Sequence, residues 1–163
     1  MSLPLVLPSG LYTLRASPAP GVGGLYATGN GINHIVTVAA EKPPFVEHQV
    51  WNIQAVHGKA GVYTITLHTS GRTFGGHWYP KGGQPVSKDP IITSDKSYEW
   101  YIAYKHTPGV ISDTITIRAP TPLIGVELFA GTNDKDQVII VSVPVTQHAE
   151  PPYWHFKHHP GPL

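Results

Sequence analysis

Gly10-Leu11-Tyr12-Thr13-Leu14-Arg15-Ala16 is the first of three similar strand-like segments, and each segment is followed by a tryptophan about forty residues later. In each segment a central threonine stands between large apolar residues. The segments and their tryptophans are residues 10–16 with Trp51, residues 61–65 with Trp100, and residues 112–119 with Trp154. Three units of about fifty residues are typical of repeat architectures, in which one unit cannot bury its apolar face alone. The pattern predicts three units, at about residues 10–58, 59–108 and 109–157, closed around one axis.

The composition indicates a single all-β domain. The chain has 163 residues, 40% of them hydrophobic, which is enough for one core. Gly and Pro, with 17 of each, indicate many turns, and long runs of helix-forming residues are missing. The candidate strands, such as 62–67 and 138–143, are rich in Val, Ile, Thr and Tyr. We therefore expect one all-β domain over residues 1–163, with a flexible tail at 158–163.

Charge and cysteine content restrict the partners and the compartment. Eleven Lys and Arg against ten Asp and Glu give a formal net charge of +1 with no basic stripe, so we expect no nucleic-acid partner. The absence of cysteine excludes disulfides and thiolate sites and fits a reducing compartment. Residues 1–8 lack a basic segment and are interrupted by Pro4 and Pro8, and no stretch is apolar enough to span a bilayer. We expect a cytoplasmic protein without a membrane segment.

Enzymatic and metal-binding interpretations find little support in the sequence. No Gly-x-Ser-x-Gly motif occurs, so an enzyme is not expected. His155, His158 and His159 lie close together near the C-terminus, and imidazole is a common ligand for zinc, copper or nickel. No Cys or carboxylate stands at ligand spacing beside them, however, and 134–136 reads as a hairpin tip rather than a calcium loop. We expect neither a metal nor a cofactor.

Two loops of the first unit have a composition that suits contact with another surface. The first pairs stiff prolines with glycines whose missing side chains allow close approach. In the second, adjacent prolines favour a rigid extended segment, and a phenylalanine offers an aromatic contact. The alternative is that both are ordinary turns. The candidate residues are Pro20, Gly21, Val22, Gly23, Gly24 and Leu25 in the first loop, and Lys42, Pro43, Pro44 and Phe45 in the second.

A third loop, between the segment ending at Leu67 and Trp78, carries one basic residue among glycines. Its central residues are Ser70, Gly71, Arg72 and Thr73. An arginine presented in this way can enter an acidic pocket, where its guanidinium forms a bidentate pair with a carboxylate. The alternative is a solvated loop arginine.

The sequence resembles the mycocypins, the fungal β-trefoil inhibitors of cysteine proteases, and in particular the clitocypin group. The resemblance covers nearly the whole chain and is strongest in the first third. The matching stretches are 14–16, 20–24, 26–28, 43–45, 49–51, 63–65, 117–120 and 124–126, together with Trp154-x-Phe156.

The resemblance implies a β-trefoil fold and a mechanism of inhibition. In that family two loops act together as a wedge that covers the active-site cleft of papain-like proteases, such as papain and the cathepsins, without covalent reaction. Carried onto this chain, the wedge consists of residues 20–25 and 42–45. The resemblance also implies reversible inhibition and a role in the defence or regulation of a fungal cell.

The third loop departs from the family pattern. Relatives that block legumain present an asparagine there, whereas this chain has Gly71 and Arg72. We therefore expect no inhibition of legumain, and we expect Arg72 to address trypsin-like serine proteases.

Two other functions compete with inhibition. Gln49-Val50-Trp51 matches the Gln-x-Trp motif of ricin-type lectins, and Trp78 and Tyr79, taken as exposed, could stack on a sugar ring. Only one unit of three carries the motif, so we interpret its tryptophan as core and its glutamine as holding the strand. The other alternative is an interaction module without a dominant loop.

Overall fold

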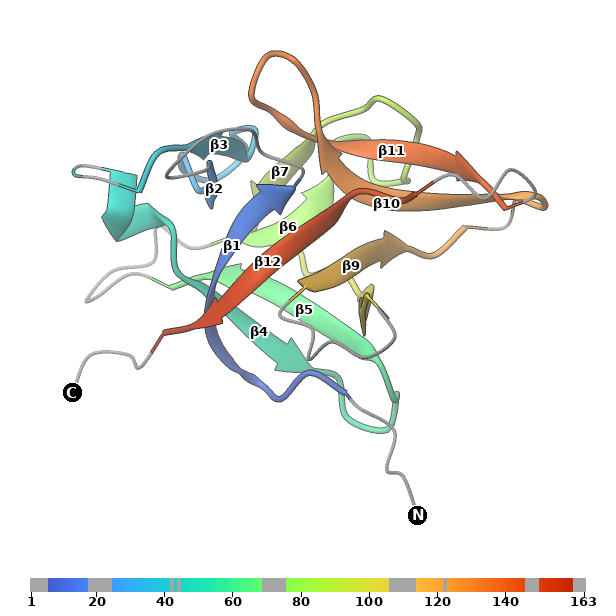
Figure 1. Ribbon diagram of the computed structural model, residues 1–163, viewed down its shortest axis with the longest axis horizontal. Helices are drawn as coiled ribbons and strands as arrows, with labels where there is room; N and C mark the ends of the chain where they lie inside the picture. Colours follow the sequence, from blue (N-terminus) through green and yellow to red (C-terminus); the bar gives the residue numbers. More distant parts are fainter. Residues whose placement is uncertain are drawn as a thin grey trace.

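The computed structural model describes residues 6–17, 25–41, 43, 45–68, 76–105, 114–121, 123–145 and 150–159. Within these residues the chain forms twelve strands and one short 3₁₀ helix, so the predicted all-β class is confirmed (Figure 1). In the same residues no helix has the length and apolar character needed to cross a membrane. The elements are β1 (Gly10–Ser17), β2 (Tyr26–Thr28), β3 (Thr37–Ala39), η1 (Phe45–His48), β4 (Trp51–Ala55), β5 (Val62–Leu67), β6 (His77–Pro80), β7 (Ile91–Ser94), β8 (Trp100–Tyr104), β9 (Thr114–Ala119), β10 (Val126–Thr132), β11 (Val138–Pro144) and β12 (Tyr153–His158).

Six of the strands form a closed antiparallel ring. β1 pairs with β4, β4 with β5, β5 with β8, β8 with β9, β9 with β12, and β12 returns to β1. The longest of these ladders joins β1 to β12 from Tyr12–His158 to Ser17–Tyr153. A closed ring has no free edge strand and therefore no row of unpaired backbone groups.

The other six strands form three hairpins attached to the ring, and two of them, β2–β3 and β10–β11, lie toward the top of the view in Figure 1. β2–β3 joins β1, β6–β7 joins β5, and β10–β11 joins β9. The hairpins also contact one another through the isolated bridges Ile35–Ile92, Thr37–Gln137 and Pro90–Ile139. The strands thus fall into three groups of four (β1–β4, β5–β8 and β9–β12), each with two ring strands and one hairpin.

A tryptophan at the start of the last strand in each group is bonded to the hairpin of the same group. Trp51 Nε1 donates to Ala27 O at 3.0 Å, and Trp154 Nε1 donates to Ala130 O at 3.0 Å. Trp100 Nε1 donates to Trp78 O at 3.1 Å. All three indoles are buried, which confirms the prediction that Trp51 belongs to the core. Their N–H groups satisfy hairpin carbonyls that would otherwise be buried without a partner.

Trp78 occupies in the second group the position that Ala27 and Ala130 hold in the other two. Its relative exposure is 0%, so the prediction that it is exposed and free to stack on a sugar is wrong. Its ring lies edge-on to the other three indoles, with centroid distances of 5.6 Å to Trp51, 6.3 Å to Trp100 and 5.9 Å to Trp154. One large side chain and two small ones therefore fill the space where the three groups meet.

The segment before β1 and the end of β12 are both held by hydrogen bonds. Leu7 is buried in the core, and its carbonyl accepts from the Tyr63 hydroxyl at 2.6 Å. The carbonyl of Pro8 accepts from the Tyr12 hydroxyl at 2.7 Å. At the other end, β12 includes His158, and His159 N donates to Leu11 O at 2.7 Å. His158 and His159, which were expected to belong to a flexible tail at 158–163, are therefore held against β1, and residues 160–163 lie outside the described residues.

Replacing the central indole should be costly. We expect Trp78→Ala to lower the free energy of unfolding by about 3–5 kcal/mol, because it removes a fully buried aromatic side chain and leaves a cavity among three indoles. Trp78→Phe keeps aromatic packing and should cost less. Tyr101→Ala is the control, since this ring strand tyrosine is 38% exposed and contacts Arg118. Urea unfolding of the three variants measures the differences, and equal losses for Trp78→Ala and Tyr101→Ala would contradict the central role of Trp78.

The buried tyrosines should make the fold sensitive to alkali. Burial, with a smaller contribution from Tyr104, raises the pKa of Tyr63 and that of Tyr12. The folded state therefore favours the neutral phenol over the phenolate more strongly than the unfolded state does. The stabilisation that these two tyrosines provide is complete below about pH 10 and is lost as the pH rises through the folded-state pKa. We expect Tm to fall as the pH rises above about 10, and to fall less in Tyr63→Phe. An equal fall in both proteins would assign the alkaline loss to other groups.

Candidate functional site

The structure describes only part of the predicted loops. Of the first loop it describes Leu25, and of the second it describes Pro43, which is exposed, and the backbone of Phe45. The rest, namely residues 20–24, Lys42, Pro44 and 70–73, lies outside the described residues, and the roles assigned to these residues stay predictions. What the structure does define is the base from which each loop leaves the body.

The first loop leaves and re-enters at adjacent points of the sheet. β1 ends at Ser17 and the described chain resumes at Leu25, whose carbonyl accepts from Ala16 N at 2.9 Å. Arg15 then pairs with Tyr26, the first residue of β2. The Leu25 side chain is partly buried against the hydrophobic core. The two ends of the chain that border residues 18–24 are therefore held together by both backbone bonding and packing.

The second loop starts beside the end of the first. β3 runs antiparallel to β2, and its last residue, Ala39, is the register partner of Tyr26. In an antiparallel pair the N-terminal end of one strand lies at the C-terminal end of the other, so residues 18–25 and 40–45 extend from the same end of one hairpin. The structure thus brings together the bases of the two loops that the sequence analysis singled out separately.

A buried glutamine connects the strands that carry these loops. Gln49, which follows η1 directly, has a relative exposure of 1%. Its Nε2 donates to Thr28 Oγ1 at 3.1 Å, in β2. It also donates to Ala39 O at 3.2 Å and to Ala40 O at 3.1 Å, at the start of the second loop. The sequence analysis expected Gln49 to hold the strand; the Gln-x-Trp motif pointed to it but not to its partners.

The third loop has a different base. Leu67 N, at the end of β5, donates to Gly76 O at 3.1 Å, immediately before β6. A Cβ on Gly76 would lie 2.9 Å from Ser94 N and 2.8 Å from Ile32 Cδ1, so only glycine fits there. Arg72 therefore belongs to a loop carried by β5 and β6, a different hairpin from the one that carries the first two loops.

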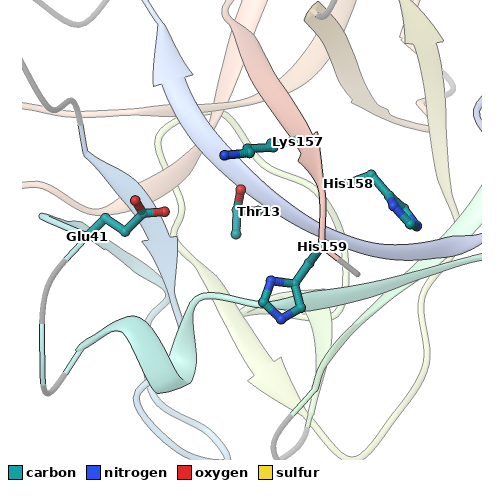
Figure 2. Close-up of a pocket in the computed structure, with 5 residues that line it drawn as sticks. All are labelled: Thr13, Glu41, Lys157, His158 and His159. Atoms are coloured by element: carbon teal, nitrogen blue, oxygen red, sulfur yellow. The ribbon is translucent and has the colours of Figure 1, made fainter. Parts of the chain in front are cut away.

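A small polar pocket borders the second loop (Figure 2). It has a volume of about 130 Å³ and is lined by Thr13 of β1, by Lys157 and His158 of β12, and by His159 and Glu41. Figure 2 shows Lys157 and Glu41 pointing toward Thr13, whose hydroxyl has no hydrogen-bond partner among the described residues. The sequence analysis missed this pocket, because its residues come from three separate segments.

The described residues hold no metal-binding cluster. They contain no group of three His, Cys, Asp or Glu side chains placed to hold a metal ion. The Gln-x-Trp motif offers no sugar site, because Gln49, Val50 and Trp51 are all buried. Trp78 is buried as well, so that of the residues that supported the lectin alternative only Tyr79 is partly exposed.

The described residues therefore form an all-β body that carries the bases of the three loops. The family model described as "Peptidase inhibitor clitocypin" matches residues 10–156. Among curated proteins, Clitocypin-4/-3 of Clitocybe nebularis is 34% identical over 138 residues, which cover 81% of this chain and 84% of the relative. Clitocypin-2 of the same organism is 35% identical over 130 residues, with 77% and 80% coverage. The chain belongs to the clitocypin family of peptidase inhibitors, and it is not an enzyme.

Proposed function

We propose that this peptidase inhibitor is a β-trefoil that acts on papain-like cysteine proteases, such as papain and the cathepsins. In this proposal the loops at 20–25 and 42–45 cover the active-site cleft from both sides of the catalytic cysteine, without a covalent reaction. The observation that carries the proposal is the Tyr26–Ala39 register, since it brings the bases of both loops to one end of one hairpin.

The strand arrangement supports the trefoil. A six-stranded ring with three attached hairpins, in three groups of four strands, is the topology that three pseudo-repeats of about fifty residues would produce. The indole bonds of Trp51, Trp100 and Trp154 occur at corresponding positions of the three groups.

The chemistry of the two loops supports a wedge. Glycines at 21, 23 and 24 leave room for close backbone approach, and prolines at 43 and 44 limit the conformations of the second loop. The bond from Ala16 N to Leu25 O fixes the base of the first loop before any partner is bound. A preorganised inhibitor loses little entropy on binding, so inhibition is expected to be tight and reversible.

The third loop is proposed to contact a different enzyme. Arg72 stands in the segment between β5 and β6, whose base is separate from that of the first two loops. Its guanidinium suits the acidic pocket of a trypsin-like serine protease, whereas the lack of an asparagine there argues against legumain.

Enzyme titration tests the wedge directly. We expect the protein to inhibit papain and cathepsin L reversibly, and Gly24→Trp to raise Ki for papain about a hundredfold, as when a central contact of an interface is lost. The bulky ring would prevent the close approach of the first loop. Gly82→Trp is the matched control, because Gly82 lies between β6 and β7 with open space where a side chain would begin.

Parallel assays with trypsin and legumain test the third loop. We expect inhibition of trypsin that disappears in Arg72→Ala, no inhibition of legumain, and unchanged inhibition of papain by this variant.

Equal Ki values for papain in the parent, Gly24→Trp and Gly82→Trp would refute the wedge.

A further inference from the structure

We propose that Gln49 is a positioning residue for inhibition, whose buried amide fixes the two loops of the β2–β3 hairpin relative to each other. This inference rests on the proposed function and goes beyond it, because Gln49 would determine affinity without touching the peptidase.

The hydrogen bonds around Gln49 permit one orientation of its amide. Thr28 Oγ1 donates its own proton to Tyr26 O at 2.8 Å, so toward Gln49 it can only accept. The carbonyls of Ala39 and Ala40 are acceptors as well. Three acceptors surround one nitrogen, which must therefore be the NH₂ group rather than the amide oxygen.

These bonds connect both loops at their bases. Tyr26 directly follows Leu25, the last residue of the first loop, and it is linked to Gln49 through the Thr28 hydroxyl. Ala40 stands at the start of the second loop. Gln49 stands just after η1, at the other end of that loop. One side chain therefore joins the end of the first loop to both ends of the second.

A further backbone bond reinforces the same junction. Gly29 N, just after β2, donates to His48 O at 2.9 Å, at the end of η1. The chain that follows the second loop is thus tied to the β2 region both by the His48 carbonyl and by the Gln49 side chain. Rotation of η1 away from the hairpin would have to break this bond together with those of the amide.

The other two strand groups show that the hairpins dock without such an amide. The residue two places before the tryptophan is Gln49 in the first group, Tyr98 in the second and Pro152 in the third. Tyr98 packs edge-on against Trp100 at a centroid distance of 5.0 Å, and proline has no side-chain donor. All three groups nevertheless keep the bond from the indole to the hairpin. The amide is therefore an addition confined to the hairpin that carries the two proposed inhibitory loops.

Fixing the loops in advance raises affinity because binding then does not have to order them. Without the amide, the carbonyls of Ala39 and Ala40 lose their shared donor, and the Thr28 hydroxyl loses its link to the second loop. The body of the protein should remain folded, since its ring and its indole bonds do not involve Gln49. The expected consequence is looser loops on an intact scaffold.

The test replaces Gln49 with methionine, which has a similar length and no hydrogen-bonding amide. We expect Gln49→Met to raise Ki for papain about tenfold, as expected when preorganisation is lost. Gln54→Met, on an exposed position of β4, is the matched control and should leave Ki unchanged. Ile140→Val, in the buried core of β11, controls for stability: it should lower Tm without changing Ki.

Amide hydrogen exchange provides a readout independent of inhibition. Exchange should quicken in segments 25–28 and 37–41 of Gln49→Met and remain unchanged in the ring strands. Thr28→Val removes the hydroxyl of the same network and should also raise Ki. Its effect should not add to that of Gln49→Met, because both break one connection.

The outcomes separate this inference from the proposed function. If the parent protein does not inhibit papain, the proposed function fails and this inference fails with it. If the parent inhibits papain and Gln49→Met inhibits equally well, only the positioning role is wrong. A Ki that rises in Gln49→Met and in Ile140→Val in proportion to the loss of Tm would also overturn it, since the effect would then be one of stability.

Discussion

The packing of four indoles at the centre of the molecule is the constraint on which the rest of the structure depends. Trp78 contacts Trp51, Trp100 and Trp154, and each of those three donates a hydrogen bond to a hairpin. The same rings therefore fill the space between the strand groups and attach the hairpins to the ring. The ion pairs Lys59–Glu99 and Arg118–Glu127, whose side chains are at least one third exposed, add little by comparison, since water screens such pairs.

The central cluster also shows why the three groups cannot be identical. Three tryptophans at the positions of Ala27, Trp78 and Ala130 would not fit in one core, and three alanines would leave it hollow. One large residue, Trp78, and two small ones, Ala27 and Ala130, fill the space at the centre. The side chains therefore differ where the backbones of the three groups correspond. Gln49 breaks the symmetry a second time, in the hairpin that carries the first two loops.

Periodic features could be predicted from the sequence, whereas features that depend on distant contacts could not. The strands around Tyr12 and Tyr63 and the burial of Trp51, Trp100 and Trp154 follow from local composition and spacing, and the structure agrees. Trp78 was misjudged because neighbouring glycines suggest an exposed loop; its burial results from contacts with rings far away in the chain. The hydrogen-bond partners of Gln49 and the pocket at Thr13 likewise depend on segments that only the fold brings together.

The register of the β2–β3 hairpin links the core to the loops. Ala27 and Val38 face each other in this register and are both buried, and the carbonyl of Ala27 is the acceptor for Trp51. A slip of one residue would turn Val38 out of the core, so burial favours the register that places Tyr26 opposite Ala39. That pairing is also what brings the bases of the two loops together. The spacing of the loops is therefore fixed by the same contacts that stabilise the fold, which leaves the loop sequences free to vary with the partner.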